Sequence, residues 1–118
     1  MVNTGLNYLK EARVRLASYL SCDSDDLVLM TNPSYGINTI VKSIPLNAGD
    51  EILTTNLEYG AMDRTWKYYC MQRGAIYRTV EFDFPIRSKE EFLKTFWSAC
   101  TSKTKAIFIS HITSATAL

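Results

Sequence analysis

Three consecutive residues have the types and spacing that could bind a phosphate group. Ser34, Tyr35 and Gly36 stand between a short apolar run at 27–30 and an amphipathic segment that begins at Ile37. The first amide groups of a helix have no intrahelical partner and favour anions, and a glycine lets a ligand approach the backbone closely. A plain helix cap is the alternative, because serine is a common capping residue. The spacing matches neither the P-loop nor the dinucleotide-binding glycine pattern.

A second candidate contact is the pair Tyr59-Gly60, which follows a strand predicted over 51–55. An aromatic ring at the carboxyl end of a strand could lie over a flat ring ligand. The alternative, which the sequence alone favours, is an aromatic side chain that packs at the rim of the domain.

The third candidate segment, 110–116, combines hydroxyl residues with the only histidine, His111. A nucleophilic pair of Ser110 and His111 is disfavoured, because neighbouring strand residues point to opposite faces and no G-x-S-x-G motif is present. A zinc site is disfavoured too, because the three cysteines are scattered over the chain. We therefore assign no catalytic residue and no metal ligand, and we expect His111 to be partly buried and structural.

The composition argues against several classes of protein. The chain has 118 residues, enough for about one domain, and 47% of them are hydrophobic. A net charge of +1 without a long run of one sign argues against a nucleic-acid partner, and no apolar stretch is long enough to span a membrane. No signal peptide is recognisable, and three cysteines without C-x-x-C spacing are typical of reduced thiols. We therefore expect a cytoplasmic protein.

Helices and strands are predicted to alternate along the chain. Helices are expected over 5–20, 37–44, 61–73 and 88–99, and strands over 27–30, 51–55, 75–82 and 105–110. This order predicts an α/β fold, with a largely parallel sheet between two layers of helices. Ligands bind such sheets outside the carboxyl ends of the strands, where all three candidate segments fall.

Two helix ends and one buried helix face can be predicted from single residues. Gly74 stands where a left-handed cap would end the third helix, and Ser88 with Glu91 forms a capping box at the start of the fourth. The fourth helix is expected to bury Phe92, Phe96 and Leu93.

Four segments, in this order, resemble class V aminotransferases. They are residues 32–38, 45–55, 58–63 and 104–114. Members of this family are fold-type-I enzymes that depend on pyridoxal 5′-phosphate (PLP). The amino-acid sequences of these segments are most similar to those of the isopenicillin N epimerase-like branch, and cysteine desulfurases are more distant relatives.

The resemblance implies PLP as the cofactor and a role for each candidate segment. Ser34, with the backbone of Tyr35 and Gly36, matches the loop that holds the PLP phosphate. Tyr59 stands where the family carries an aromatic residue stacked on the pyridine ring. Ser114 stands near the polar contact to the ring hydroxyl.

The sequence also departs from the family pattern. Pro33 and Tyr35 stand where the epimerase-like branch has a small residue and threonine, and 115–118 differ from the Pro and Thr-Gly that usually follow Ser114. In the family, the Schiff-base lysine and the small C-terminal domain lie beyond this point, and a further segment precedes residue 5. We therefore expect 1–118 to be a partial PLP-binding large domain that is inactive alone.

The resemblance implies that the intact relative is a homodimer that acts on an amino acid. It would transaminate, epimerise or eliminate through a PLP aldimine. Two alternatives stay open. One is a truncated remnant or interaction module without PLP chemistry, and the other is a small domain that binds a nucleotide or another phosphorylated ligand.

Overall fold

The computed structural model describes residues 2–117, with side chains from residue 4 onward. The chain divides into two compact units, Met1–Pro33 and Ser34–Leu118, which are described separately. The second unit contains the sheet and every residue that is predicted to contact a cofactor.

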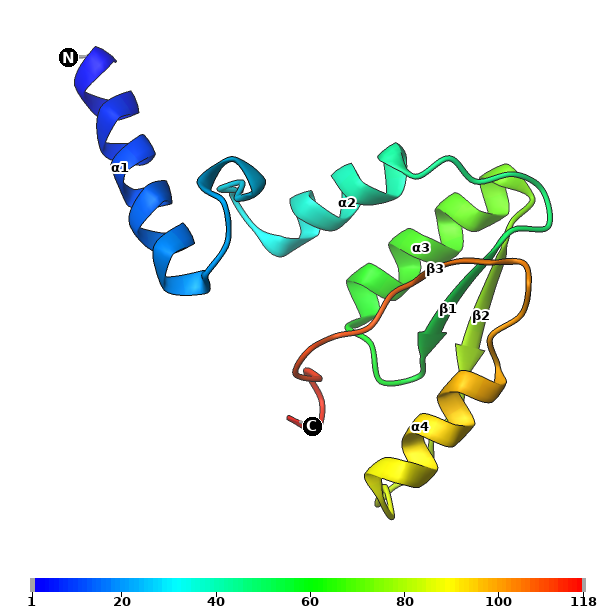
Figure 1. Ribbon diagram of the computed structural model, residues 1–118. Helices are drawn as coiled ribbons and strands as arrows, with labels where there is room; N and C mark the ends of the chain where they lie inside the picture. The colour runs from blue at the N-terminus through cyan, green and yellow to red at the C-terminus, as the bar shows by residue number, and fades with distance from the viewer. Residues whose placement is uncertain (1, 118) are drawn as a thin grey trace. The chain divides into compact units, whose positions relative to one another are not determined.

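The sheet of the second unit has three parallel strands, with β1 in the centre. Figure 1 shows β1 and β2 as neighbouring arrows that point the same way. The strands are β1 (Glu51–Thr55), β2 (Ile76–Val80) and β3 (Thr104–Ile107), in the order β2-β1-β3. β1 is parallel to both neighbours, and all five of its residues are buried. Burial on both faces is typical of a central strand in a parallel sheet. The strand predicted over 51–55 is confirmed.

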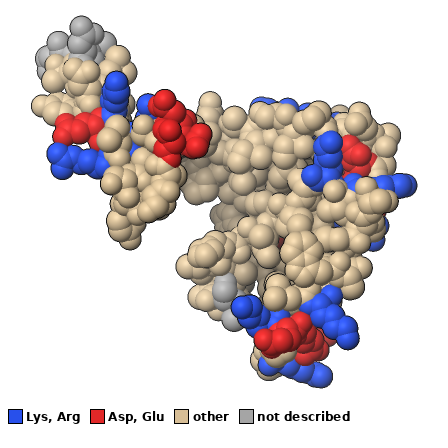
Figure 2. All heavy atoms as spheres, viewed as in Figure 1, with Lys and Arg blue, Asp and Glu red and all other residues tan. Residues whose placement is uncertain are grey.

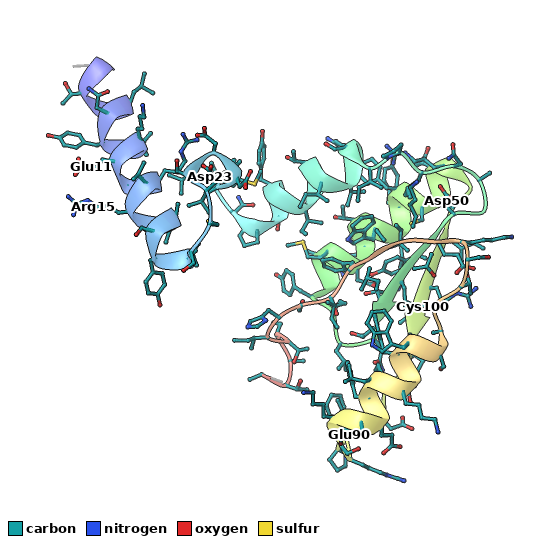
Figure 3. All side chains as sticks on the ribbon, in the orientation of Figure 1. Glu11, Arg15, Asp23, Asp50, Glu90 and Cys100 are labelled. Carbon is teal, nitrogen blue, oxygen red and sulfur yellow. The ribbon has the colours of Figure 1, made fainter. Side chains whose placement is uncertain are left out.

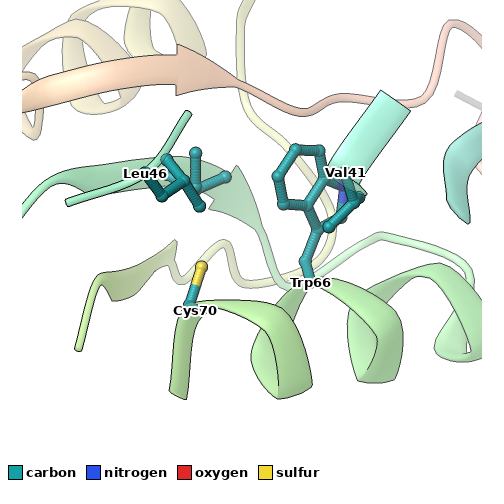
Figure 4. Packing of buried hydrophobic residues seen from close by; sticks show 5 residues of the cluster. Val41, Leu46, Trp66 and Cys70 are labelled. Atoms are coloured by element: carbon teal, nitrogen blue, oxygen red, sulfur yellow. The ribbon is translucent and has the colours of Figure 1, made fainter. Parts of the chain in front are cut away.

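Helices α2 (Pro33–Ser43) and α3 (Gly60–Arg73) pack against one face of the sheet. The buried cluster on this face consists of Val41, Leu46, Ile52, Trp66 and Cys70 (Figure 4). It joins residues of α2, β1 and α3, so the two helices are held to the sheet by the same side chains.

Helix α4 (Lys89–Ser98) packs against the other face. The buried cluster there consists of Leu53, Val80 and Phe96. Phe82 and Phe92 extend it as a stacked pair with ring centroids 4.3 Å apart. Helices therefore cover both faces of the sheet, and the predicted α/β fold with a parallel sheet is confirmed. In Figure 2, acidic and basic side chains lie next to one another over α4, so this part of the surface has no patch of one sign.

The predicted cap at Gly74 is present, and so is the hydroxyl half of the predicted capping box at Ser88. Gly74 adopts φ 65°, and its amide donates to the last carbonyl groups of α3. The Ser88 hydroxyl accepts a hydrogen bond of 3.1 Å from the Glu91 amide at the start of α4. The prediction that Leu93 is buried is wrong, because its side chain is 39% exposed. Phe96 packs against the sheet, Phe92 stacks beside it on Phe82 and Phe96, and Leu93 takes part in neither contact.

An ion pair between a buried glutamate and a partly exposed arginine closes the amino end of β1. The Glu51 carboxylate accepts hydrogen bonds of 3.2 and 2.6 Å from the Arg78 guanidinium and one of 2.7 Å from the Thr101 hydroxyl. Glu51 is only 3% exposed. The Arg78 and Thr101 donors lower the pKa of Glu51, because they stabilise its charged form. This pair links β1 to β2 and to the turn before β3.

The first unit contains α1 (Val2–Leu20) and a short 3₁₀ helix, η1 (Ser24–Asp26). On α1, Arg15 and Glu11 form an ion pair of 2.7 Å one turn apart (Figure 3). No helix among residues 2–117 is long and apolar enough to cross a bilayer.

The strand predicted over 27–30 is absent, and this prediction is wrong. Residues 27–30 form no regular structure, and Val28 is 68% exposed. An apolar run becomes a strand only when a neighbour supplies its backbone hydrogen bonds. Among the described residues, the first unit has helices and no strand that could do so.

Candidate cofactor-binding site

The carboxyl ends of β1 and β3 are joined by one carboxylate. Glu58 Oε2 accepts hydrogen bonds from the Ser110 amide at 2.9 Å and from the Ser110 hydroxyl at 2.6 Å. Glu58 Oε1 accepts a hydrogen bond of 2.9 Å from the Thr55 hydroxyl. The segment after β1 is therefore held against the segment after β3, 52 residues further along the chain.

An asparagine joins the carboxyl ends of β1 and β2 in a similar way. The Asn56 side chain accepts from the Phe82 amide at 3.0 Å and donates to the Phe82 carbonyl at 3.1 Å. The Asn56 amide donates to the Val80 carbonyl at 3.1 Å. All three strands are thus tied together just beyond their carboxyl ends, where the fold places a ligand.

Tyr59 follows Glu58 directly and caps the start of α3. Its backbone is extended, with φ −63° and ψ 125°, and its carbonyl accepts hydrogen bonds from the amides of Met62 and Asp63. Its side chain makes no capping hydrogen bond and is 51% exposed. The ring is therefore fixed at its base and half open to solvent.

Ser34, Tyr35 and Gly36 lie in the first turn of α2, which begins at Pro33. The sequence predicted a loop here and a helix start at Ile37. The helix starts earlier because proline has no amide to leave unpaired and its φ suits the first helical position. Ser34 is exposed and Gly36 is half-buried. All three residues are therefore at the helix end that favours an anion.

A groove of about 380 Å³ runs between α2 and α3. Asn38 lines it from α2, and its side chain donates to the Ser34 carbonyl at 2.9 Å. Ala61 and Arg64 line it from the start of α3. The second turn of α2 and the start of α3 therefore lie on either side of this groove.

Arg64 places a positive charge in this groove. One guanidinium nitrogen lies 3.4 Å from the point that a Cβ on Gly60 would occupy. Among residues 2–117, the Arg64 guanidinium has no acidic partner, while the nearby Asp63 is paired with Lys67 at 2.8 Å. Sequence reasoning missed Arg64, although its place one turn after Gly60 could have indicated it.

The third candidate segment forms a turn. Thr113 is buried, its hydroxyl is 2.6 Å from that of Thr116, and its carbonyl accepts a hydrogen bond from the Ala117 amide. Ser114 is exposed. His111 is exposed as well, so the prediction that it is partly buried is wrong. It lies beyond β3, and neither of the two buried clusters includes it.

The structure brings two of the three predicted segments together and leaves the segment of Ser34, Tyr35 and Gly36 apart from them. The Tyr59 and Ser114 segments are adjacent, because Glu58 and Ser110 join them. No hydrogen bond between described residues connects Ser34 to Tyr59 or to Ser114.

The described side chains offer no metal site, and the buried thiol of Cys70 is not activated. No group of three His, Cys, Asp or Glu residues within 2–117 is arranged to hold a metal ion. Burial raises the pKa of the Cys70 thiol, which keeps it protonated and unreactive.

The side chains on this edge do fit the chemistry of PLP. For a phosphate, the start of α2 offers an exposed hydroxyl at Ser34, and the groove that Asn38 lines offers the Arg64 guanidinium, which has no acidic partner among residues 2–117. For a pyridine ring, the site offers the half-exposed aromatic ring of Tyr59. The carboxylates closest to these groups in sequence, Glu58 and Asp63, are already occupied by hydrogen bonds or an ion pair.

Known proteins with similar sequences point to one family. Residues 4–117 match the family described as Aminotransferase class-V. Isopenicillin N epimerase of Amycolatopsis lactamdurans is 33% identical over 110 residues, which are 91% of this chain and 28% of that protein. A probable cysteine desulfurase of Synechocystis sp. is 30% identical over 105 residues, which are 85% of this chain and 24% of that protein. The chain thus spans about a quarter of these relatives.

Solved structures show the same fold. The cystine C-S lyase C-DES with its product cysteine persulfide superposes with a TM-score of 0.87 at 19% identity, over 98% of this chain and 30% of C-DES. A lysine-to-alanine variant of C-DES, with glycine covalently linked to its PLP cofactor, gives a TM-score of 0.83 over 94% of this chain and 29% of C-DES, also at 19% identity. With the family match over residues 4–117, these findings show that the chain belongs to the class V aminotransferases, a PLP-dependent family.

Proposed function

We propose that this chain supplies part of a PLP site at the carboxyl edge of its sheet. Ser34, with the backbone of Tyr35 and Gly36, contacts the phosphate, Tyr59 covers one face of the ring, and Ser114 contacts the ring hydroxyl. The observation that carries the proposal is the pair of hydrogen bonds from Ser110 to Glu58. They hold the segments of Tyr59 and Ser114 side by side, at the edge where the fold places a ligand.

Each residue has a separate task in this site. The Ser34 hydroxyl donates to the phosphate, and the dipole of α2 stabilises its charge. The Tyr59 ring excludes water from one face of the pyridine ring and limits its tilt. The Ser114 hydroxyl orients the ring through its substituent. Bound PLP supplies an electron sink for bonds at an amino acid α-carbon. No residue of this chain is assigned a catalytic role.

The proposal for the whole protein is broader. We propose that residues 1–118 are part of the PLP-binding large domain of a cytoplasmic homodimer that transaminates, epimerises or eliminates at an amino acid. The identity of 33% to isopenicillin N epimerase over 110 residues supports an amino-acid-derived substrate.

Titration of the 118-residue chain with pyridoxamine 5′-phosphate tests the site. This amine form has no aldehyde, so it does not react with surface lysines. We expect saturable binding that inorganic phosphate competes for. Ser34→Ala should weaken both ligands, whereas Tyr59→Ala should weaken only pyridoxamine 5′-phosphate.

Two control variants match these changes. Ser43→Ala removes a hydroxyl from the other end of α2, where it donates to the Thr39 carbonyl. Tyr8→Ala removes an exposed tyrosine from the first unit. Neither should alter the affinity. Equal weakening by Ser34→Ala and Ser43→Ala, or a lack of competition by phosphate, would contradict the proposal.

The mass of the endogenous protein tests the alternative of a non-catalytic remnant. A mass several times the 13.4 kDa of this chain would support a complete PLP enzyme. A mass of 13.4 kDa would favour a binding or interaction role.

A further inference from the structure

We propose that Glu58 is the positioning residue for the cofactor ring. It sets the place of Tyr59 relative to the segment 110–114 and does not itself touch the cofactor. This inference rests on the proposed PLP site.

The hydrogen bonds of Glu58 divide between its two oxygens. Oε1 accepts from the Thr55 hydroxyl at 2.9 Å, which anchors the carboxylate to the last residue of β1. Oε2 accepts from the Ser110 amide and hydroxyl at 2.9 and 2.6 Å, which anchors it to the chain after β3. The Thr55 hydroxyl in turn accepts from the Leu57 amide at 3.2 Å, so the turn between Thr55 and Glu58 is also closed.

The hydrogen bonds of Glu58 fix the position of Tyr59, because Tyr59 lies between Glu58 and the first turn of α3 in the chain. On its far side, the Tyr59 carbonyl is held by the amides of Met62 and Asp63 in the first turn of α3. On its near side, the backbone enters directly from Glu58. With no side-chain bond at this cap, the direction of the Tyr59 ring depends on these two attachments.

The same bonds act on Ser114. Ser110 is the third residue after β3, and the chain from there turns at 114–116. Thr113 and Ala117 close that turn with a hydrogen bond of 2.9 Å. Ser114 therefore lies on a short turn whose entrance is held by Glu58. One carboxylate thus sets the distance between a ring contact and a ring-hydroxyl contact.

The chemistry of the tether favours a carboxylate. Only an ionised carboxylate offers two acceptor oxygens for three donors at once. In Glu58→Gln, the amide oxygen can still accept from Ser110, and the amide nitrogen can donate to the Thr55 hydroxyl, which rotates to accept. In Glu58→Ala, all three hydrogen bonds are lost. The glutamine variant should therefore retain part of the function that the alanine variant loses.

The test compares two ligands on the full 118-residue chain. Pyridoxamine 5′-phosphate reports on ring and phosphate contacts together, and inorganic phosphate reports on the α2 end alone. Because Glu58→Ala removes three hydrogen bonds to one carboxylate, we expect it to raise the Kd of pyridoxamine 5′-phosphate about tenfold or more. The Kd of inorganic phosphate should not change. Glu58→Gln should raise the first Kd only about two- to threefold.

A spectroscopic signal and a control variant separate positioning from a general loss of order. The circular dichroism induced in the absorption band of the bound pyridine ring should fall in Glu58→Ala at saturating ligand, and it should recover in Glu58→Gln. Glu51→Gln provides the control, because Glu51 also accepts three hydrogen bonds, at the opposite end of β1. It should leave both affinities and the induced signal unchanged.

Ser110→Ala keeps the test informative if Glu58→Ala does not fold. It removes only the hydroxyl that lies 2.6 Å from Glu58 and leaves the hydrogen bond from the Ser110 backbone amide in place. We expect a two- to threefold rise in the Kd of pyridoxamine 5′-phosphate, about the size of one modest hydrogen bond.

An unchanged Kd of pyridoxamine 5′-phosphate in folded Glu58→Ala, or in Ser110→Ala if Glu58→Ala fails to fold, would overturn the inference and leave the proposed site intact. Equal weakening of both ligands would overturn it too. Failure of the wild-type chain to bind pyridoxamine 5′-phosphate would overturn the proposed site, and this inference with it.

Discussion

At each end of β1, a glutamate carboxylate accepts three hydrogen bonds, and the two carboxylates serve different purposes. At the amino end, the Glu51 carboxylate accepts three hydrogen bonds, two of them from the cation Arg78. Just beyond the carboxyl end, the Glu58 carboxylate also accepts three, all from the neutral groups of Thr55 and Ser110. Both carboxylates connect β1 to neighbouring chain.

The difference lies in what surrounds each carboxylate. Glu51 is 3% exposed and faces its partners only, so its bonds can serve stability alone. Glu58 is half-buried and is followed by the half-exposed Tyr59. A similar number of hydrogen bonds therefore stabilises the fold at one edge and orders an open surface at the other. Changes at the amino edge should alter stability, and changes at the carboxyl edge should alter binding.

Leu53→Ala should have the largest effect, because Leu53 lies in the middle of β1 and is fully buried. It packs with Val80 and Phe96 between the sheet and α4. Its truncation should cost about 2–5 kcal/mol in the free energy of unfolding, from lost burial and the cavity that remains. Urea unfolding followed by circular dichroism measures this loss. Leu6→Ala on α1, where the side chain is 64% exposed, is the control and should change stability by less than about 0.5 kcal/mol.

Glu51→Gln should weaken the amino edge and change the response to acid. The lowered pKa of Glu51 means that its charged form is favoured in the folded state. This stabilisation is complete above the ordinary glutamate pKa of about 4.3 and is lost as the pH falls through the lower folded-state pKa. Wild-type stability should therefore fall in this acid range, and the glutamine variant should be less stable at neutral pH, with a shallower fall.

Melting temperatures measured between pH 7 and pH 3 would show this change in slope. Glu90→Gln on the exposed face of α4 is the control and should follow the wild-type profile. Parallel profiles for wild type and Glu51→Gln would show that the Arg78 contact does not stabilise the fold.

Gly74→Ala should have a smaller effect at the same amino edge. Gly74 ends α3 with φ 65°, and its carbonyl accepts a hydrogen bond of 2.9 Å from the Gly49 amide. An alanine in this left-handed conformation costs roughly 1–2 kcal/mol, and its Cβ would lie 3.3 Å from that of Ala48. Chemical denaturation should show this loss with no change in the affinity for pyridoxamine 5′-phosphate. A matched change in affinity would contradict the division between the two edges.

A segment that the sequence predicts to be a strand forms one only where neighbouring strands are present to pair with it. Two short segments, the apolar run 27–30 and the mixed segment 51–55, were both predicted to be strands, and only the second is one. Residues 51–55 lie between two parallel neighbours, whereas the unit that contains 27–30 has only helices among its described residues. Local composition sets the tendency, and pairing decides the outcome.

The candidate site follows the same rule. The predicted segments do lie at strand ends and at a helix start, because these places follow from the order of the elements. The bond between Glu58 and Ser110 spans 52 residues and could not be predicted from either segment alone. The same holds for the groove that brings Arg64 beside Asn38. Contacts between distant segments depend on the packing of the sheet and its helices.

Tyr59→Ala should have the smallest effect on stability, which makes it the sharpest test of the comparison. The side chain is 51% exposed and makes no capping hydrogen bond, so its removal should change the free energy of unfolding by less than about 0.5 kcal/mol. Loss of ring stacking should nevertheless raise the Kd of pyridoxamine 5′-phosphate about three- to tenfold. Tyr59→Phe should bind like the wild type, because the ring and not the hydroxyl provides the contact. Calorimetric titration and urea unfolding of the same samples give both quantities. A stability loss comparable to that of Gly74→Ala, with unchanged affinity, would show that Tyr59 is a packed rim residue and that the carboxyl edge, like the amino edge, serves the fold.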